Sequence, residues 1–237
     1  MLLKFLLFAA PFLYAFIAMK LSAWQMQRKL RRDSSPMNDV AVRRLHQKLA
    51  RVAKIESIDI RIHEVSPING MVLPNGEIYI TRGLMNCYLR GDISGEELAS
   101  VVAHEIGHVL LGHAKGRLAS FAGQNAARIL LGALFNRFIP FLGAFLAQAL
   151  ITLFFKRLSR DDEFAADAYA SALLTAAGIG TQPQKSLFRK LPTLTGQSGG
   201  GIAWLMSHPR IEDRIHAIEK REERWKSDED HQMPTHS

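Results

Sequence analysis

The sequence predicts an α+β fold that is mostly helical, with a small antiparallel sheet placed before a central helix. Alternating apolar and polar residues, the pattern of half-buried strands, form short stretches between residues 58 and 81. Longer stretches with the apolar spacing of helices follow from residue 94 onwards. Residues 1–19 carry a single charge, at Lys4, which is typical of a helix anchored in a membrane.

Composition and charge narrow the class of protein. The chain has 237 residues, of which 48% are hydrophobic. Its one cysteine, Cys87, excludes an intrachain disulfide, and we expect it to be a small core residue. The net charge is +8, and the segment from Lys20 to Lys54 alone holds ten basic and two acidic residues, which accounts for the whole excess. This concentration of charge argues against a nucleic-acid-binding protein.

Residues 1–24 are predicted to form an uncleaved N-terminal transmembrane anchor, because their length is close to the ~20 residues that a membrane helix needs. The basic cluster at 28–32 follows directly and could contact membrane lipid. The positive-inside rule then places the rest of the chain in the cytoplasm, at the cell (inner) membrane. The alternative is a cleaved secretory signal and a periplasmic protein, but we find no convincing small-x-small cleavage site.

Residues 25–56 are predicted to form a basic juxtamembrane segment that continues into an amphipathic helix at 38–55. His46 lies among the charged residues of this helix, and we expect it at the surface. The apolar face of the helix consists of Val42, Leu45, Leu49 and Val52, which recur at helical spacing.

Three strands at 58–62, 71–73 and 77–81 are predicted to form an antiparallel meander. The first alternates isoleucines with polar residues, and Pro74-Asn75-Gly76 makes a strong turn before the third. We expect the third strand to lie at the edge of a cleft, where an extended peptide could add to it as a further strand.

The central helix is predicted to begin at Ser94, which forms a capping box with Glu97. His104 and His108 are four residues apart, so on a helix their imidazoles project side by side and can bind one small ion. With Glu105 they form the pattern His-Glu-x-x-His, in which both histidines bind zinc and the glutamate acts as general base toward water. The alternative is a chance match whose histidines only cap backbone carbonyls.

A catalytic zinc site usually has a third protein ligand. One class of zinc peptidases uses a histidine six residues beyond the second, but Ala114 stands there and His113 is one residue early. We therefore expect His113 to be a helix-end residue, favoured by the helix dipole. The other class uses a glutamate from a downstream helix, and Glu163 fits, with Asp167 one turn later to accept a hydrogen bond from a ligand imidazole. Alternatively, both are surface acids at a helix start.

Residues 118–155 are apolar, with Arg128 and Arg137 as their only charges. Because the two histidines precede this stretch and Glu163 follows it, a shared ion requires the stretch to cross a membrane twice or not at all. We predict an apolar helical hairpin that lies partly in the membrane surface or caps the cleft, with a double span as the alternative. Beyond it we predict a short helix at 183–191, a loop at 193–201, a last helix from 207 to about 226 and a polar tail at 227–237.

Four motifs follow one another along the chain, at Asn69–Leu84, Glu96–His108, Ser159–Asp167 and Ser207–Ile215. In this order they resemble the membrane-associated gluzincin metallopeptidases, which include the heat-shock protease HtpX and the CAAX prenyl proteases. The resemblance covers roughly residues 57–220 and departs at Gly70-Met71, where the family tends to have alanine and an aromatic residue. It implies a zincin-type metallopeptidase domain at 57–226 that binds one Zn²⁺ per chain through His104, His108 and Glu163, with Glu105 as catalytic base.

The same resemblance suggests that the loop with His208 borders the cleft, where His208 would donate a hydrogen bond to the oxyanion or bind the zinc in a resting state. The alternative is a simple loop residue before a helix. Arg214 is predicted to clamp an acid. The sequence thus predicts a membrane-anchored zinc endopeptidase that acts on peptide or protein substrates in membrane quality control. The alternative is a chaperone-like scaffold with a structural zinc, although a structural site needs no base such as Glu105.

Overall fold

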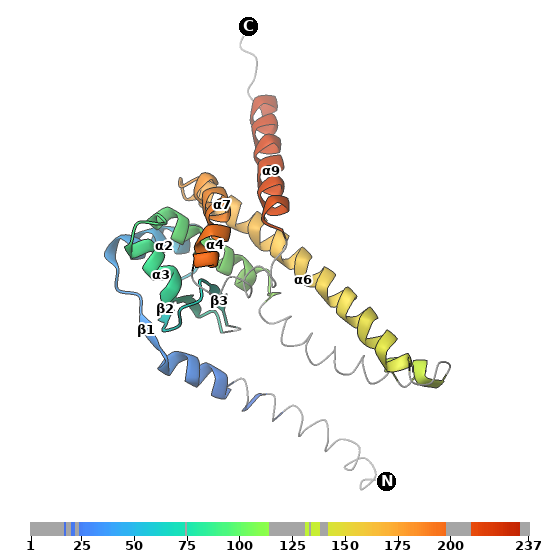
Figure 1. The fold of residues 1–237 in the computed structure, drawn as a ribbon. Coiled ribbons are helices and arrows are strands. Elements are labelled where there is room, and N and C mark those ends of the chain that lie inside the picture. Colours follow the sequence, from blue (N-terminus) through green and yellow to red (C-terminus); the bar gives the residue numbers. More distant parts are fainter. Residues whose placement is uncertain are drawn as a thin grey trace, which may run out of the picture.

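The computed structural model describes residues 17, 20–21, 24–73, 75–113, 131–132, 134–137, 142–197 and 210–232, and Figure 1 shows their course. A helical segment at 24–32 leads into the domain. Helices dominate the described residues and one small sheet accompanies them, so the predicted α+β class is confirmed. The elements are β1 (Ser34–Pro36), α2 (Val40–Val52), β2 (Ile60–His63), β3 (Gly70–Val72), β4 (Ile78–Thr81), α3 (Arg82–Leu89), α4 (Gly95–Leu110), α6 (Gly143–Ala176), α7 (Gln182–Gln197) and α9 (Ile211–Gln232).

The sheet is mixed, so the predicted antiparallel meander is wrong. Its strand order is β1-β2-β4-β3. Strand β2 pairs with β4 in parallel, with Ile62 opposite Ile80, whereas β1 pairs antiparallel with β2, and β3 pairs antiparallel with β4. Every residue of β4 is buried, whereas β3 is half-buried throughout. The backbone N–H and C=O groups of a fully buried strand need hydrogen-bond partners on both of its neighbouring strands. Strand β4 therefore lies in the interior of the sheet, and β3 forms one of its two edges.

Helix α4 lies at the centre of the domain, where it packs against α2, α6, α7 and β3. It begins with the predicted capping box. The Glu97 N–H donates to the Ser94 hydroxyl at 3.1 Å, and the Ser94 N–H donates to the Glu97 carboxylate at 2.7 Å. Its buried apolar side chains belong to the core cluster and include Leu98, Val102 and Ile106. The histidine pattern is therefore held in a helix that other elements enclose on several sides.

Helix α6 is a single element of 34 residues, and in Figure 1 its first part extends away from the domain. The segment 159–167, predicted to start a helix, lies in its middle. The sequence from Ala144 to Ala176 has no glycine or proline, so no residue type in it favours a break. The final part of the predicted 118–155 hairpin is continuous with this helix. Residues 131–132 and 134–137 are helical, and the others between 118 and 141 lie outside the described residues.

Two C-terminal helices are longer than predicted. Helix α7 continues through Pro192, although proline cannot donate the usual helical hydrogen bond. Leu194 is buried just beyond, and the Thr195 hydroxyl donates to the Leu191 carbonyl at 2.7 Å, which stabilises this turn. Helix α9 extends to Gln232, into the segment predicted as a polar tail. The remaining residues 233–237 lie outside the described part.

Among the described residues, no helix is both long enough and apolar enough to cross a membrane. Most of the predicted anchor at 1–24 lies outside the described residues.

His46 is buried, with only 5% of its surface exposed, and the prediction of a surface position is wrong. His46 lines a pocket together with Met37 and Ile60, so chain segments on both sides of α2 in the sequence surround this part of the helix. Burial lowers the pKa of His46 to about 4, and the side chain is therefore neutral at pH 7.

Candidate metal centre

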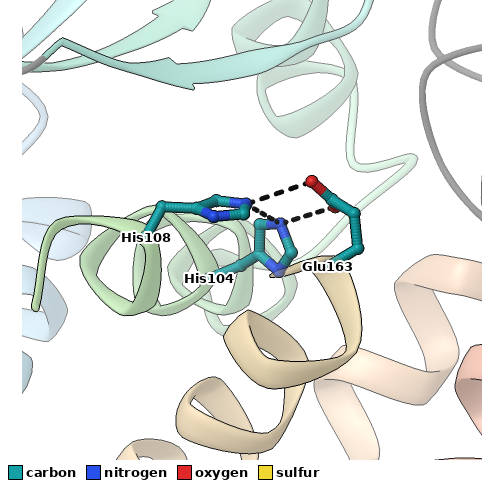
Figure 2. A group of neighbouring side chains, drawn as sticks. All are labelled: His104, His108 and Glu163. Carbon is teal, nitrogen blue, oxygen red and sulfur yellow. Dashed lines mark hydrogen bonds and ion pairs between the residues drawn. The ribbon is translucent and has the colours of Figure 1, made fainter. Parts of the chain in front are cut away.

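Three side chains from two helices converge on one point (Figure 2). His104 and His108 come from α4 and Glu163 from α6, and all three are buried. The Nε2 atoms of the two histidines lie 3.1 Å apart. Each Nε2 also faces one carboxylate oxygen of Glu163, at 3.3 Å from His104 and 3.2 Å from His108. The structure thus brings together the three residues that the sequence proposed as metal ligands.

The two helices approach closely because Gly107 has no side chain. A Cβ at this position would lie 3.0 Å from the Ala166 carbonyl oxygen and 3.3 Å from Cβ of Tyr169, both on α6. Such contacts are tight enough to force a shift of the α6 backbone. Gly107 directly precedes His108 in the sequence. The missing side chain lets α4 and α6 approach closely at this point, and this approach brings His108 next to Glu163.

His104 is oriented from behind by Asp167, whose Oδ1 atom lies 2.9 Å from His104 Nδ1. Burial by itself lowers the pKa of His104, but the hydrogen bonds to Asp167 and Glu163 outweigh it and raise the pKa to about 9. A metal ion that binds Nε2 therefore displaces a proton near neutral pH, because only the unprotonated nitrogen can be a ligand.

Arg214 of α9 clamps Asp167, as the sequence predicted for this arginine. Its Nε and Nη2 atoms donate to the two oxygens of Asp167, each at 2.6 Å. The guanidinium carbon also lies 4.2 Å from the ring centroid of Phe188 on α7. Burial raises the pKa of Asp167, but the charge and hydrogen bonds of Arg214 outweigh this effect and lower it to about 2. Asp167 is therefore a permanent anion at neutral pH.

His113 lies behind the other histidine, which the sequence did not predict. Its Nδ1 atom is 3.1 Å from Nδ1 of His108, and its Nε2 atom is 3.5 Å from Oδ1 of Asp162 on α6. Among the described residues, the group able to hold a metal consists of His104, His108 and Glu163, without His113. The signal available in the sequence was Gly112, because a glycine after a helix turns the chain back.

Glu105 lines a cavity of about 40 Å³ next to the histidines. The cavity lies between α4, α7 and the start of β3, and its wall includes Gly70, Phe188 and Arg214. A Cβ at Gly70 would lie 3.4 Å from a carboxylate oxygen of Glu105, so β3 passes directly over this residue. The strand beside the site is therefore β3. Strand β4, predicted at the cleft edge, has partners on both sides and cannot accept a further strand.

The donor set fits zinc. Two imidazole nitrogens and one carboxylate oxygen lie within 4.8 Å of one another in a buried position. Nitrogen and oxygen donors of this kind, three from the protein with a position left for water, are typical of catalytic zinc sites. The orienting contacts behind both imidazoles are also typical of histidines that bind metals. His208 lies outside the described residues, so its relation to this group stays a prediction.

Comparison with known proteins agrees with this geometry. The chain is 27% identical to Metalloprotease YcaL of Escherichia coli (strain K12), over 74% of this chain and 69% of that protein. It is 27% identical to Metalloprotease LoiP of the same organism, over 70% of this chain and 63% of that protein. It is also 27% identical to Mitochondrial metalloendopeptidase OMA1 of Schizosaccharomyces pombe, over 76% of this chain and 51% of that protein.

The chain thus spans between about half and about two thirds of the length of these relatives. The sequence pattern of peptidase family M48 matches residues 36–222, from β1 into α9, and includes every described residue of the metal centre. The chain therefore belongs to peptidase family M48, a family of metalloproteases.

Proposed function

We propose that this protein is a zinc-dependent endopeptidase that hydrolyses peptide bonds in protein substrates. The observation that carries the proposal is the meeting of His104, His108 and Glu163 at one buried point, with Glu105 beside them at a cavity. Family membership supports the same activity. The three converging residues would hold one Zn²⁺, with Asp167 orienting the imidazole of His104.

The proposed chemistry divides between the metal and Glu105. When bound, zinc would polarise the scissile carbonyl and lower the pKa of a water molecule toward ~7. The Glu105 carboxylate takes a proton from the attacking water and then passes it to the nitrogen of the leaving amine. Glu105 can do this because it follows His104 on α4 and faces the same cavity. In the proposed mechanism His208, which precedes α9 in the sequence, assists by donating a hydrogen bond to the oxyanion or by binding zinc at rest.

An extended substrate would bind along β3. This strand ends the sheet, contacts α4 and passes over Glu105. Backbone hydrogen bonds to such an edge depend little on the side chains of the substrate. We therefore propose that protein substrates bind with a loose sequence preference, through the strand that neighbours the catalytic glutamate.

We further propose that residues 1–24 anchor the protein in the cell (inner) membrane and that the catalytic domain faces the cytoplasm. The uncharged run at 5–19 and the basic cluster at 28–32, which would contact membrane lipid, support this topology. A role in quality control of misfolded membrane proteins, as the likeness to HtpX and the CAAX prenyl proteases implies, would follow from it. The proposed anchor and topology are independent of the metal chemistry, whereas the quality-control role requires it.

The decisive experiment replaces Glu105 by glutamine and measures zinc content together with casein cleavage. We expect the Glu105→Gln variant to keep its zinc and to lose at least about 100-fold in activity, because only the base is removed. Glu96→Gln is the matched control, because Glu96 is an exposed acid of the same helix. Glu163→Ala should lose the zinc itself. Activity of Glu105→Gln close to that of wild type would refute the enzyme assignment, and a zinc-loaded but inactive wild type would favour the scaffold instead.

A further inference from the structure

We propose that His113 is a positioning residue that orients the metal ligand His108 through a hydrogen bond and is itself oriented by Asp162. The inference rests on the proposed zinc site, since it assigns a role toward the same ion. It adds a residue that the His-Glu-x-x-His pattern does not contain. The contact that carries it joins the Nδ1 atoms of His108 and His113, at 3.1 Å.

The donor and acceptor roles along this contact follow from which nitrogen faces the metal. His108 turns its Nε2 atom toward Glu163 and His104, so Nδ1 is the nitrogen left to carry the proton. That Nδ1–H can donate only to an unprotonated nitrogen. His113 therefore accepts through Nδ1 and carries its own proton on Nε2, which points toward Oδ1 of Asp162 at 3.5 Å. A hydrogen bond thus runs from His108 to His113, and the Nε2–H of His113 faces the carboxylate of Asp162.

The local backbone explains how His113 reaches this position. Helix α4 ends at Leu110, and Gly112 follows with a φ of +77°. This left-handed conformation turns the chain back at the helix end, and it is strained for residues that have a side chain. On a continuing helix, His113 would project about 140° away from His108. The turn at Gly112 instead brings the two rings to a centroid distance of 5.3 Å.

His113 acts on the imidazole of His108 and does not act as a fourth ligand. Its close contact is with Nδ1, on the side of the His108 ring that faces away from Glu163 and His104. A hydrogen bond at this nitrogen fixes the tautomer and the ring orientation and raises the basicity of the ligand. The carboxylate of Asp167 makes the corresponding contact behind His104. Each zinc-binding histidine thereby has its own orienting partner.

The test measures zinc affinity of the full-length protein by competition with a chromophoric chelator. His113→Ala removes the acceptor, and we expect zinc to bind roughly 10–100-fold more weakly. His113→Asn places its amide oxygen close to the position of the histidine Nδ1, so we expect affinity within about threefold of wild type. His216→Ala is the control, because His216 is an exposed histidine of α9 and has no role in the proposal.

The visible absorption of the Co²⁺-substituted protein supplies a second measurement, because it reports the geometry of the ligands. We expect His113→Ala to change this spectrum and His113→Asn to preserve it. Equal zinc affinity of wild type and His113→Ala would overturn the inference while leaving the proposed peptidase intact. Weak binding by both His113 variants would also overturn it, since the loss would then not depend on the acceptor. A wild-type protein that binds no zinc at this site would refute the proposed function and this inference together.

Discussion

His104 and His108 lie one turn apart on α4, yet the residues behind them differ in burial and in charge. Behind His104, the side chains of Asp167 and Arg214 are each 1% exposed and form a charged pair. Behind His108, the side chain of His113 is 14% exposed and that of Asp162 is 39% exposed. The first pair joins α6 to α9, whereas the second joins the end of α4 to α6. The same metal centre therefore has a buried side and a partly exposed side.

Because of this difference, we expect the two sides to affect different properties, namely the stability of the fold and the affinity for metal. A buried carboxylate that loses its partner is costly, because no water replaces the lost interaction. The orientation of His104 is thereby tied to the packing of three helices. A half-buried acid such as Asp162 is partly solvated, so its loss has little effect on folding. We expect changes behind His104 to act on stability first, and changes behind His108 to act on metal binding alone.

The largest expected effect comes from Arg214→Met, which leaves Asp167 buried without its cation. We expect the free energy of unfolding of the metal-free protein to fall by roughly 3–5 kcal/mol, measured by urea denaturation. Arg189→Met is the matched control, because Arg189 forms an exposed pair with Glu219 of α9, and its loss should cost less than about 1 kcal/mol. If both variants lost the same free energy of unfolding, the buried ion pair would contribute no more to stability than the exposed one, and the distinction would fail.

The pH dependence of the free energy of unfolding should show the contribution of the buried Asp167 without any mutation at Arg214. Asp167 has an ordinary pKa of 3.8, which Arg214 and the neighbouring hydrogen bonds lower to about 2 in the folded protein against the effect of burial. Its ionised form therefore stabilises the fold above about pH 4, and this contribution of about 2 kcal/mol is lost as the pH falls toward 2. We expect an Asp167→Asn variant to lack this part of the pH dependence in urea unfolding of the metal-free protein. An unchanged pH dependence would contradict the assignment.

The smallest expected effect on stability comes from Asp162→Asn, on the exposed side. We expect a loss of less than about 1 kcal/mol in the free energy of unfolding, because the side chain is partly solvated. Zinc should bind more weakly than to wild type, but by less than the roughly 10–100-fold expected for loss of Asp167. Zinc titration of the folded variant measures this directly. A large loss of stability would show that both sides of the site support the fold.

Features that depend on neighbouring residues were predictable from the sequence. The capping box of Ser94 and Glu97 needs only a spacing of three residues, and it is present. The shared face of His104 and His108 follows from helix geometry alone. Glu163 and Asp167 were identified because they too are four residues apart, on a helix that the local sequence favours. In each case the positions are determined by hydrogen bonds and periodicity within one helix.

Features that depend on contacts between distant segments were not predictable in this way. His46 is buried although it lies among the charged residues of α2, and it lines the same pocket as Met37 and Ile60, which belong to other segments of the chain. The position of His113 depends on a single left-handed residue, Gly112, and on where α6 places Asp162. The interior place of β4 depends on its complete burial, which the alternating pattern did not reveal.

The sequence by itself determined which residues are the candidates for the metal site, because their spacing on helices is a local property. Only the tertiary structure decided how those residues are supported. The pairing of Asp167 with Arg214 and of His108 with His113 requires α9 and the turn after α4 to meet α4 and α6 in space. Long-range packing selects such contacts through the burial of apolar surface. Apolar spacing along the chain shows which face of a helix is buried, but it does not show which distant element packs against that face.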